Sequence, residues 1–295
     1  MADSDFNKDI FESTRASRIY FLPNLMTAGN LFCGFVAVIK CIQANTVTQI
    51  GKEHLSMELY THAVLFILAA VVFDIFDGML ARLGGRESLF GKEFDSLADI
   101  ISFGIAPALM MFFLLLKPAE TYPFFVWIGW FTGYIYLLCA AVRLARFNVL
   151  THPAVFYRNK KPVNKDFIGL PVPAAAGAII SLVFFLNHYD LRGGVIILPG
   201  LLLLVSWLMV SAIRYPGFKH VDWRMRIRFR TFILLLAAAV LLWRFWGIGL
   251  AVIFYGYIFT GLFMHFRRIN RRARRLKELE SKRSKLVKNH KKDGE

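Results

Sequence analysis

Apolar residues form long runs along most of this chain, and short polar stretches separate the runs. A transmembrane α-helix needs about 20 mostly apolar residues, and these runs are near or above that length. The pattern therefore predicts eight membrane-spanning helices, at 21–43, 61–82, 96–116, 123–143, 168–187, 195–213, 230–246 and 247–266. If the last two merge around Gly247, the number is seven. The expected fold is an all-α, polytopic helix bundle within a membrane.

Composition agrees with this topology, because 57% of the residues are hydrophobic and the mean hydropathy is +0.50, unlike a soluble globular protein. We expect residues 21–266 to be one membrane domain. Residues 1–20 lack the features of a cleaved signal peptide and should form an amphipathic cytoplasmic segment, in which Asp3 or Ser4 caps a short helix along the membrane interface. Residues 267–295 form a basic cytoplasmic tail that either rests on anionic lipid or is disordered.

The basic residues indicate the orientation. Because the chain would cross the membrane at each span, every second connecting segment lies on the same side of the membrane. Of the 36 Lys and Arg residues, 31 fall in the segments on one side. Cytoplasmic loops carry the excess of Lys and Arg, so both termini are expected in the cytoplasm. The net charge of +16 then reflects topology and attraction to anionic lipid headgroups, and nucleic acid is not an expected partner. An uncleaved polytopic chain without an organelle address fits a bacterial inner membrane. The cysteines, Cys33, Cys41 and Cys139, are expected to pack as small apolar residues without disulfides.

Four acidic residues interrupt the apolar pattern, at Asp74, Asp77, Asp95 and Asp99. A charged side chain at bilayer depth costs a few kcal/mol or more unless it is paired or hydrated. The first two acids are three residues apart and the last two are four apart, so on helices each pair shares one face. Two antiparallel helices would direct all four carboxylates at one point, where oxygen ligands suit Mg²⁺ or Mn²⁺. The alternative is that they are solvated helix ends, or that they pair with Arg82 and Lys92.

Residues 77–99 read D-G-x2-A-R-x8-G-x3-D-x3-D. This pattern matches at every position the signature of the CDP-alcohol phosphatidyltransferases, membrane enzymes that move a phosphatidyl or similar group from a CDP-linked donor to an alcohol. The resemblance implies two divalent cations per site and a general base, Asp99, for the acceptor hydroxyl. An alternative leaves Asp99 as a metal ligand only. The ligands implied are Asp74, Asp77, Asp95 and Asp99, and the residues that shape the CDP site are Gly78, Ala81, Arg82 and Gly91.

The expected reaction gives an independent reason for finding these residue types at these positions. Displacing CMP from a pyrophosphate requires neutralisation of charge on the phosphate oxygens, which two cations held by carboxylates supply in many phosphoryl-transfer sites. Small residues at Gly78 and Ala81 would let a nucleotide approach the helix backbone, and Arg82 offers a forked donor for phosphate. Each also has a simpler interpretation, because small residues serve helix packing and Arg82 fits a cytoplasmic charge.

Further polar stretches bear on the acceptor alcohol. The sequence resembles the phosphatidylserine synthase branch of the family in the segments LPNLMTAGNLFCGF (22–35), SFGIAPA (102–108), RLARFN (143–148), GLPVPAAAG (169–177) and SAIRYP (211–216). That branch joins CDP-diacylglycerol to L-serine. Asn24 and Thr27 are expected to contribute an amide and a hydroxyl to the CDP site, although Asn24 could instead cap a helix. The family's members are typically homodimers, which implies a homodimer here.

Serine would need a cationic partner for its carboxylate. Three arginines lie at cytoplasmic ends of predicted spans, namely Arg143, Arg146 and Arg214. We expect at least one to bind the serine carboxylate, and the alternatives are phosphate binding or a role in topology alone. Other acceptors, such as glycerol phosphate, an inositol phosphate or choline, remain alternatives. An ion-coupled transporter is a further alternative, but transporters commonly place ion sites between related repeats, and here all four acids fall in one predicted hairpin.

Overall fold

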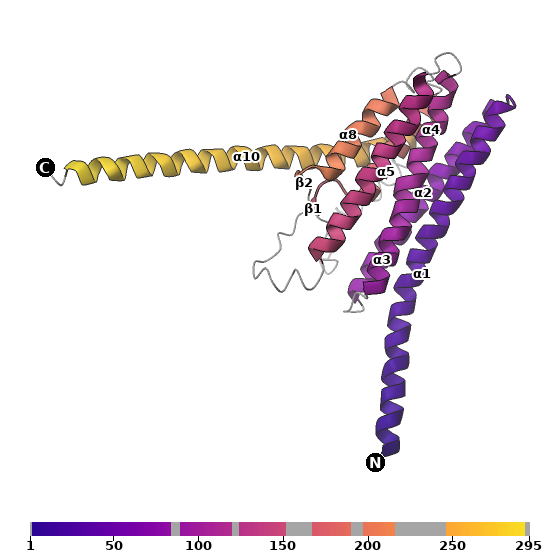
Figure 1. The fold of residues 1–295 in the computed structure, drawn as a ribbon, viewed down its shortest axis with the longest axis horizontal. Helices are drawn as coiled ribbons and strands as arrows, with labels where there is room; N and C mark the ends of the chain where they lie inside the picture. Colours follow the sequence, from indigo (N-terminus) through magenta and orange to yellow (C-terminus); the bar gives the residue numbers. More distant parts are fainter. Residues whose placement is uncertain are drawn as a thin grey trace, which may run out of the picture.

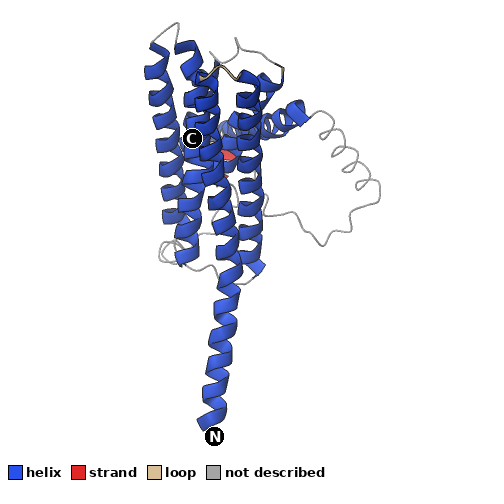
Figure 2. Cartoon of the chain, turned by 90° about the vertical axis from the view of Figure 1, so that its right-hand side faces the viewer, coloured by secondary structure: helices blue, strands red, loops and turns tan. Residues whose placement is uncertain are grey.

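The computed structural model describes residues 2–83, 89–119, 124–151, 167–189, 197–215 and 246–292. These residues are almost entirely helical, which confirms the all-α prediction for the described part of the chain (Figure 1). The helices pack side by side in a bundle, and the first helix extends well beyond it at its N-terminal end (Figure 2).

The first half of the bundle is built from four apolar segments. Helix α1 (Ala2–Gln49) and helix α2 (Glu53–Leu83) form an antiparallel hairpin. Its turn contains Gly51, whose φ of 76° is a conformation that favours glycine. Helix α3 (Leu89–Asp99) continues directly into a π-helical turn, η1 (Ile100–Ile105), and then into α4 (Ala106–Ala119). Helix α5 (Phe124–Thr151) returns along α4.

The second half contains shorter helices. Helix α7 (Val172–His188) and helix α8 (Leu198–Val210) pack on each other and on the first half. The last helix, α10 (Trp246–Lys292), contacts α7 and runs across the bundle at a large angle to α1, α2 and α5 (Figure 1). Strands β1 (Phe167–Ile168) and β2 (Arg214–Tyr215) form a small antiparallel ribbon at the ends of α7 and α8.

Seven of the eight predicted spans coincide with described helices. Five described helical segments are long and apolar enough to cross a membrane: Leu22–Gln49, Glu53–Leu80, Phe90–Leu115, Val126–Leu150 and Ile248–Arg271. The apolar helices Val172–Leu186 and Leu198–Val210 are shorter and match the spans predicted at 168–187 and 195–213. The predicted span at 230–246 lies outside the described residues, apart from Trp246 at the start of α10.

Two expectations about helix bounds were wrong. The fifth span does not begin at 168, because Gly169 has a φ of +84° and ends β1 in a turn, so that α7 starts only at Val172. Residues 2–20 do not form a separate short helix but continue into α1, with Pro23 inside that helix. Helix α10 contains the predicted span 247–266 and continues through the basic tail to Lys292.

The ribbon joins two motifs that are distant in the sequence. Phe167 pairs with Tyr215, and the backbone N–H of Gly169 donates to the carbonyl of Ile213 over 2.8 Å. A side chain at Gly169 would collide with the backbone carbonyl of Met209, so both the φ and the close approach require glycine. The segment 169–177 is thereby attached to residues 211–215 of the second motif.

The core extends from α1 through α2, η1, α4 and α5 to α7 and α8. Cys33 and Cys41 are buried in it and Cys139 packs against it, and all three thiols are free. This confirms that the cysteines act as small apolar residues.

Candidate active site

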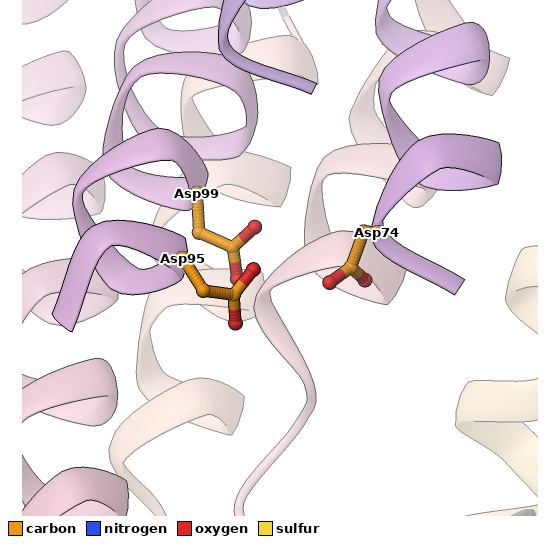
Figure 3. Close-up of side chains that lie close together, drawn as sticks. All are labelled: Asp74, Asp95 and Asp99. Carbon is orange, nitrogen blue, oxygen red and sulfur yellow. The ribbon is translucent and has the colours of Figure 1, made fainter. Parts of the chain in front are cut away.

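Three of the four predicted acids converge in the bundle. Asp74 comes from α2, and Asp95 and Asp99 come from α3, one turn apart. Each offers a carboxylate oxygen, and these oxygens all lie within 4.8 Å of one another. Figure 3 shows the three side chains pointing toward a common space between the two helices. The helical spacing of the acids thus predicted their meeting point correctly.

Asp77 takes a different position from the one predicted. It lies on α2 one turn after Asp74, with which it interacts electrostatically, but it is outside the group of three. Its side chain is 7% exposed and accepts a hydrogen bond from the hydroxyl of Thr27 on α1. The fourth acid is therefore held against α1, next to the other three.

Helix α1 holds the acids from one side. Thr27 binds Asp77, and one turn later the amide Nδ2 of Asn30 donates to Oδ1 of Asp99 over 3.0 Å. Both α1 side chains are buried. Asn24 lies one turn before Thr27 and is half-buried. The spacing of three residues from Asn24 to Thr27 to Asn30 predicted that their polar groups face the same cavity, but only Asn24 and Thr27 were predicted as CDP-site residues, and the contact of Asn30 with Asp99 was not predicted.

A close helix approach fixes the register of this contact. A methyl group at Gly34 of α1 would lie 2.6 Å from the backbone Cα of Ser102 in η1. The Ser102 hydroxyl donates to the carbonyl of Asn30 over 2.9 Å, and the Tyr136 hydroxyl on α5 donates to the carbonyl of Phe103 over 2.7 Å. The π-turn that follows Asp99 is therefore held between α1 and α5. Such turns occur frequently at functional sites.

One of the three predicted arginines lies beside the acids. The guanidinium of Arg143 on α5 interacts electrostatically with Asp99 and Asp74, and it lies 5.6 Å from the centre of the Phe147 ring. Arg146 is exposed and donates to the carbonyl of Val210 over 3.5 Å. Arg214 is half-buried in β2, opposite Ile168. The structure thus brings Arg143 to the site and gives Arg146 a contact with the end of α8.

The predicted CDP residues lie toward the ends of α2 and α3. A methyl group at Gly78 would meet no atom within 4 Å, so there is open space beside this turn of α2. Ala81 and Arg82 are in the last turn of α2, and their side chains lie outside the described residues. Gly91 is in the first turn of α3. All four precede or follow the connection between the two helices, as the predicted hairpin requires.

Asn148 connects α5 to α3 near this end of the site. Its side-chain amide donates to the hydroxyl of Ser96 over 2.9 Å, and its backbone carbonyl accepts a hydrogen bond from Nζ of Lys92 over 3.3 Å. The role of Asn148 could not be predicted beyond its membership of the segment 143–148, because a contact between two helices has no local sequence pattern.

The donor set fits divalent cations. Three carboxylates concentrate negative charge in a small, largely buried volume, and Arg143 offsets only part of it. Placing several carboxylates of like charge close together in a buried site is costly, and clusters of carboxylate oxygens are the usual ligands of Mg²⁺, Mn²⁺ and Ca²⁺. The arrangement can hold cations next to the open space at Gly78.

Comparison with known proteins connects this site to a family. The family model for CDP-alcohol phosphatidyltransferases matches residues 20–212, which include all the acids but not α10. A CDP-diacylglycerol–serine O-phosphatidyltransferase of Helicobacter pylori is 34% identical over 71% of this chain and 77% of its own length. One of Bacillus subtilis is 34% identical over 68% of this chain and 92% of its own. An archaetidylserine synthase of Methanothermobacter thermautotrophicus is 33% identical over 66% of this chain and 69% of its own.

Proposed function

This chain belongs to the CDP-alcohol phosphatidyltransferase family, and we propose that it transfers the phosphatidyl group of CDP-diacylglycerol to the hydroxyl of L-serine, giving phosphatidylserine and CMP. The observation that carries this proposal is the convergence of Asp74, Asp95 and Asp99 beside Arg143. The choice of serine is supported by relatives from two bacteria that bear that activity in their names.

The proposed site would hold two divalent cations, Mg²⁺ or Mn²⁺, on Asp74, Asp77, Asp95 and Asp99. When bound, these ions would neutralise charge on the pyrophosphate oxygens of the donor. The CDP site would be shaped by Gly78, Ala81, Arg82 and Gly91 together with Asn24 and Thr27. The open space beside Gly78 supports this assignment, because a nucleotide needs room there.

Asp99 is the proposed general base. It accepts the proton of the serine hydroxyl while the serine oxygen bonds to the phosphorus that carries diacylglycerol, and the bond from that phosphorus to the bridging oxygen breaks, which releases CMP. A base must reach the proton it removes. The hydrogen bond from Asn30 to Oδ1 would fix the orientation of the Asp99 carboxylate for this step.

We also propose where the reaction occurs. The distribution of Lys and Arg supports eight spans with both termini in the cytoplasm of a bacterium and the acids near the cytoplasmic face of the inner membrane. Water-soluble serine and CMP would exchange there while the lipid chains stay in the bilayer. A homodimer is proposed from the resemblance to the family.

An acceptor panel tests the function. Membranes containing the protein would be incubated with CDP-diacylglycerol and labelled serine, glycerol 3-phosphate, inositol phosphate or choline. We expect label in the lipid fraction with serine only. If another alcohol labels the lipid in preference to serine, phosphatidyl transfer is retained as the reaction and serine is rejected as the acceptor.

The arginines give a prediction about serine binding. Replacing Arg143 by Gln should raise the KM for serine about 10- to 100-fold, because a charge-assisted hydrogen bond contributes about 1.5–3 kcal/mol. Arg146→Gln is the matched control, one turn further along α5, and should leave that KM unchanged because Arg146 contacts the carbonyl of Val210. Arg214→Gln completes the series. If all three variants keep the wild-type KM for serine, the proposal that an arginine binds the carboxylate is wrong.

A further inference from the structure

Helix α10 lies outside the residues that the family model matches, yet it packs against helix α7 and strand β2. Tyr257 of α10 stacks on Tyr215 of β2, with ring centres 5.8 Å apart. A methyl group at Gly261, one turn beyond Tyr257, would collide with the Tyr215 ring. The glycine therefore allows α10 to approach the ribbon closely enough for the two rings to stack.

The stacked pair is continuous with the acids. Arg143 interacts electrostatically with Tyr257 as well as with Asp99 and Asp74. The Tyr257 side chain is half-buried. Arg143 on α5 is therefore within electrostatic range of both the acids on α2 and α3 and the tyrosine pair on α10 and β2.

The Tyr215 hydroxyl provides a second, independent observation. The side chain is 0% exposed, and its hydroxyl has no hydrogen-bond partner among the described residues. Burial raises the pKa of Tyr215 to about 12, so the phenol keeps its proton at physiological pH. An unpaired buried hydroxyl costs about 1–3 kcal/mol, and buried polar groups in native proteins nearly always have partners. A ligand that supplies an acceptor oxygen would remove this cost.

We propose that Tyr257 and Tyr215 complete, with Arg143, the binding site for the carboxylate of the acceptor amino alcohol. The inference rests on the proposed function and adds α10 to the acceptor site. The carboxylate accepts hydrogen bonds from the guanidinium and the phenol hydroxyls, and the stacked rings exclude water from that side, which strengthens these bonds. An amino alcohol without a carboxylate would leave the buried Tyr215 hydroxyl without this acceptor, so the site selects against it.

The test compares serine with ethanolamine, which lacks the carboxylate, as acceptors for the full-length protein. In Tyr257→Phe and Tyr215→Phe, the KM for serine should rise about tenfold or more, with kcat and the KM for CDP-diacylglycerol close to wild type. The ratio of kcat/KM for serine to that for ethanolamine should fall by the same factor. Because both acceptors are measured on one preparation, a general loss of active protein cancels from the ratio.

Tyr255→Phe is the matched control. Tyr255 lies two residues from Tyr257 on α10, and its hydroxyl donates to the carbonyl of Ala178 on α7 over 3.1 Å. This variant should keep the wild-type ratio. Equal losses with both acceptors in the two test variants would indicate a structural role and overturn the inference, and so would an unchanged ratio. If the wild-type protein makes no phosphatidylserine, the proposed function itself is wrong. The experiment therefore distinguishes a failure of the proposed function from a failure of the inference about the tyrosines.

Discussion

Replacing Asp99 by Asn is expected to lower kcat for phosphatidyl transfer about 10²- to 10⁴-fold, the range over which general bases contribute. The amide cannot accept the proton of the attacking hydroxyl, although it preserves the size of the side chain. The measurement is kcat with saturating serine and CDP-diacylglycerol, together with direct binding of CDP-diacylglycerol. Binding should change little, because two other carboxylates of the cluster remain.

The control for this variant is Glu93→Gln. Glu93 is an exposed acid on the same helix, and its carboxylate accepts a hydrogen bond from Asn148 over 3.3 Å. Its neutralisation removes one negative charge from α3 without touching the cluster, so kcat should stay near wild type. If Asp99→Asn turns over at the wild-type rate, Asp99 is not the base.

Replacing Gly34 by Ala is expected to damage both stability and activity. The added methyl group would lie 2.6 Å from the Cα of Ser102, so α1 and η1 must move apart. Overpacking of this kind typically costs about 1–3 kcal/mol. The movement also pulls Asn30 from Asp99, and a displacement of about 1 Å at a catalytic group can cost about 100-fold in rate. Thermal unfolding in detergent and kcat measure the two effects.

Gly200→Ala provides the comparison. Gly200 is in α8, and a methyl group there would meet no atom within 4 Å. Because Ala favours a helix over Gly by up to about 1 kcal/mol, this variant should be at least as stable as wild type and equally active. Equal behaviour of the two variants would show that the contact between α1 and η1 does not position the site.

The acids could be predicted from the sequence because their positions follow from local geometry. Asp74 is one turn from Asp77, and Asp95 is one turn from Asp99, so two helices and a turn were enough to bring them together. The position of Asp77 could not be predicted in this way. It depends on a hydrogen bond to Thr27 of α1, which lies 50 residues away in the sequence.

Other features depend on contacts that leave no local pattern. The apolar run near 168 resembles a helix start, but the tertiary pairing of Gly169 with Ile213 imposes a turn. Tyr257 belongs to an apolar span, and nothing in its neighbourhood in the sequence indicates that it stacks on Tyr215. In both cases packing between distant segments determined the structure, whereas hydrophobic periodicity predicted only the helices.

The most direct measurement uses the purified full-length protein with CDP-diacylglycerol, L-serine and Mn²⁺ or Mg²⁺, with and without a chelator. We expect phosphatidylserine and CMP to form in equal amounts with the metal, to be absent with the chelator, and to return when metal is added in excess. Phosphatidylserine formation that continues at the same rate in the chelator would contradict a metal-dependent site at the three convergent aspartates, and CMP release without phosphatidylserine would contradict serine as the acceptor.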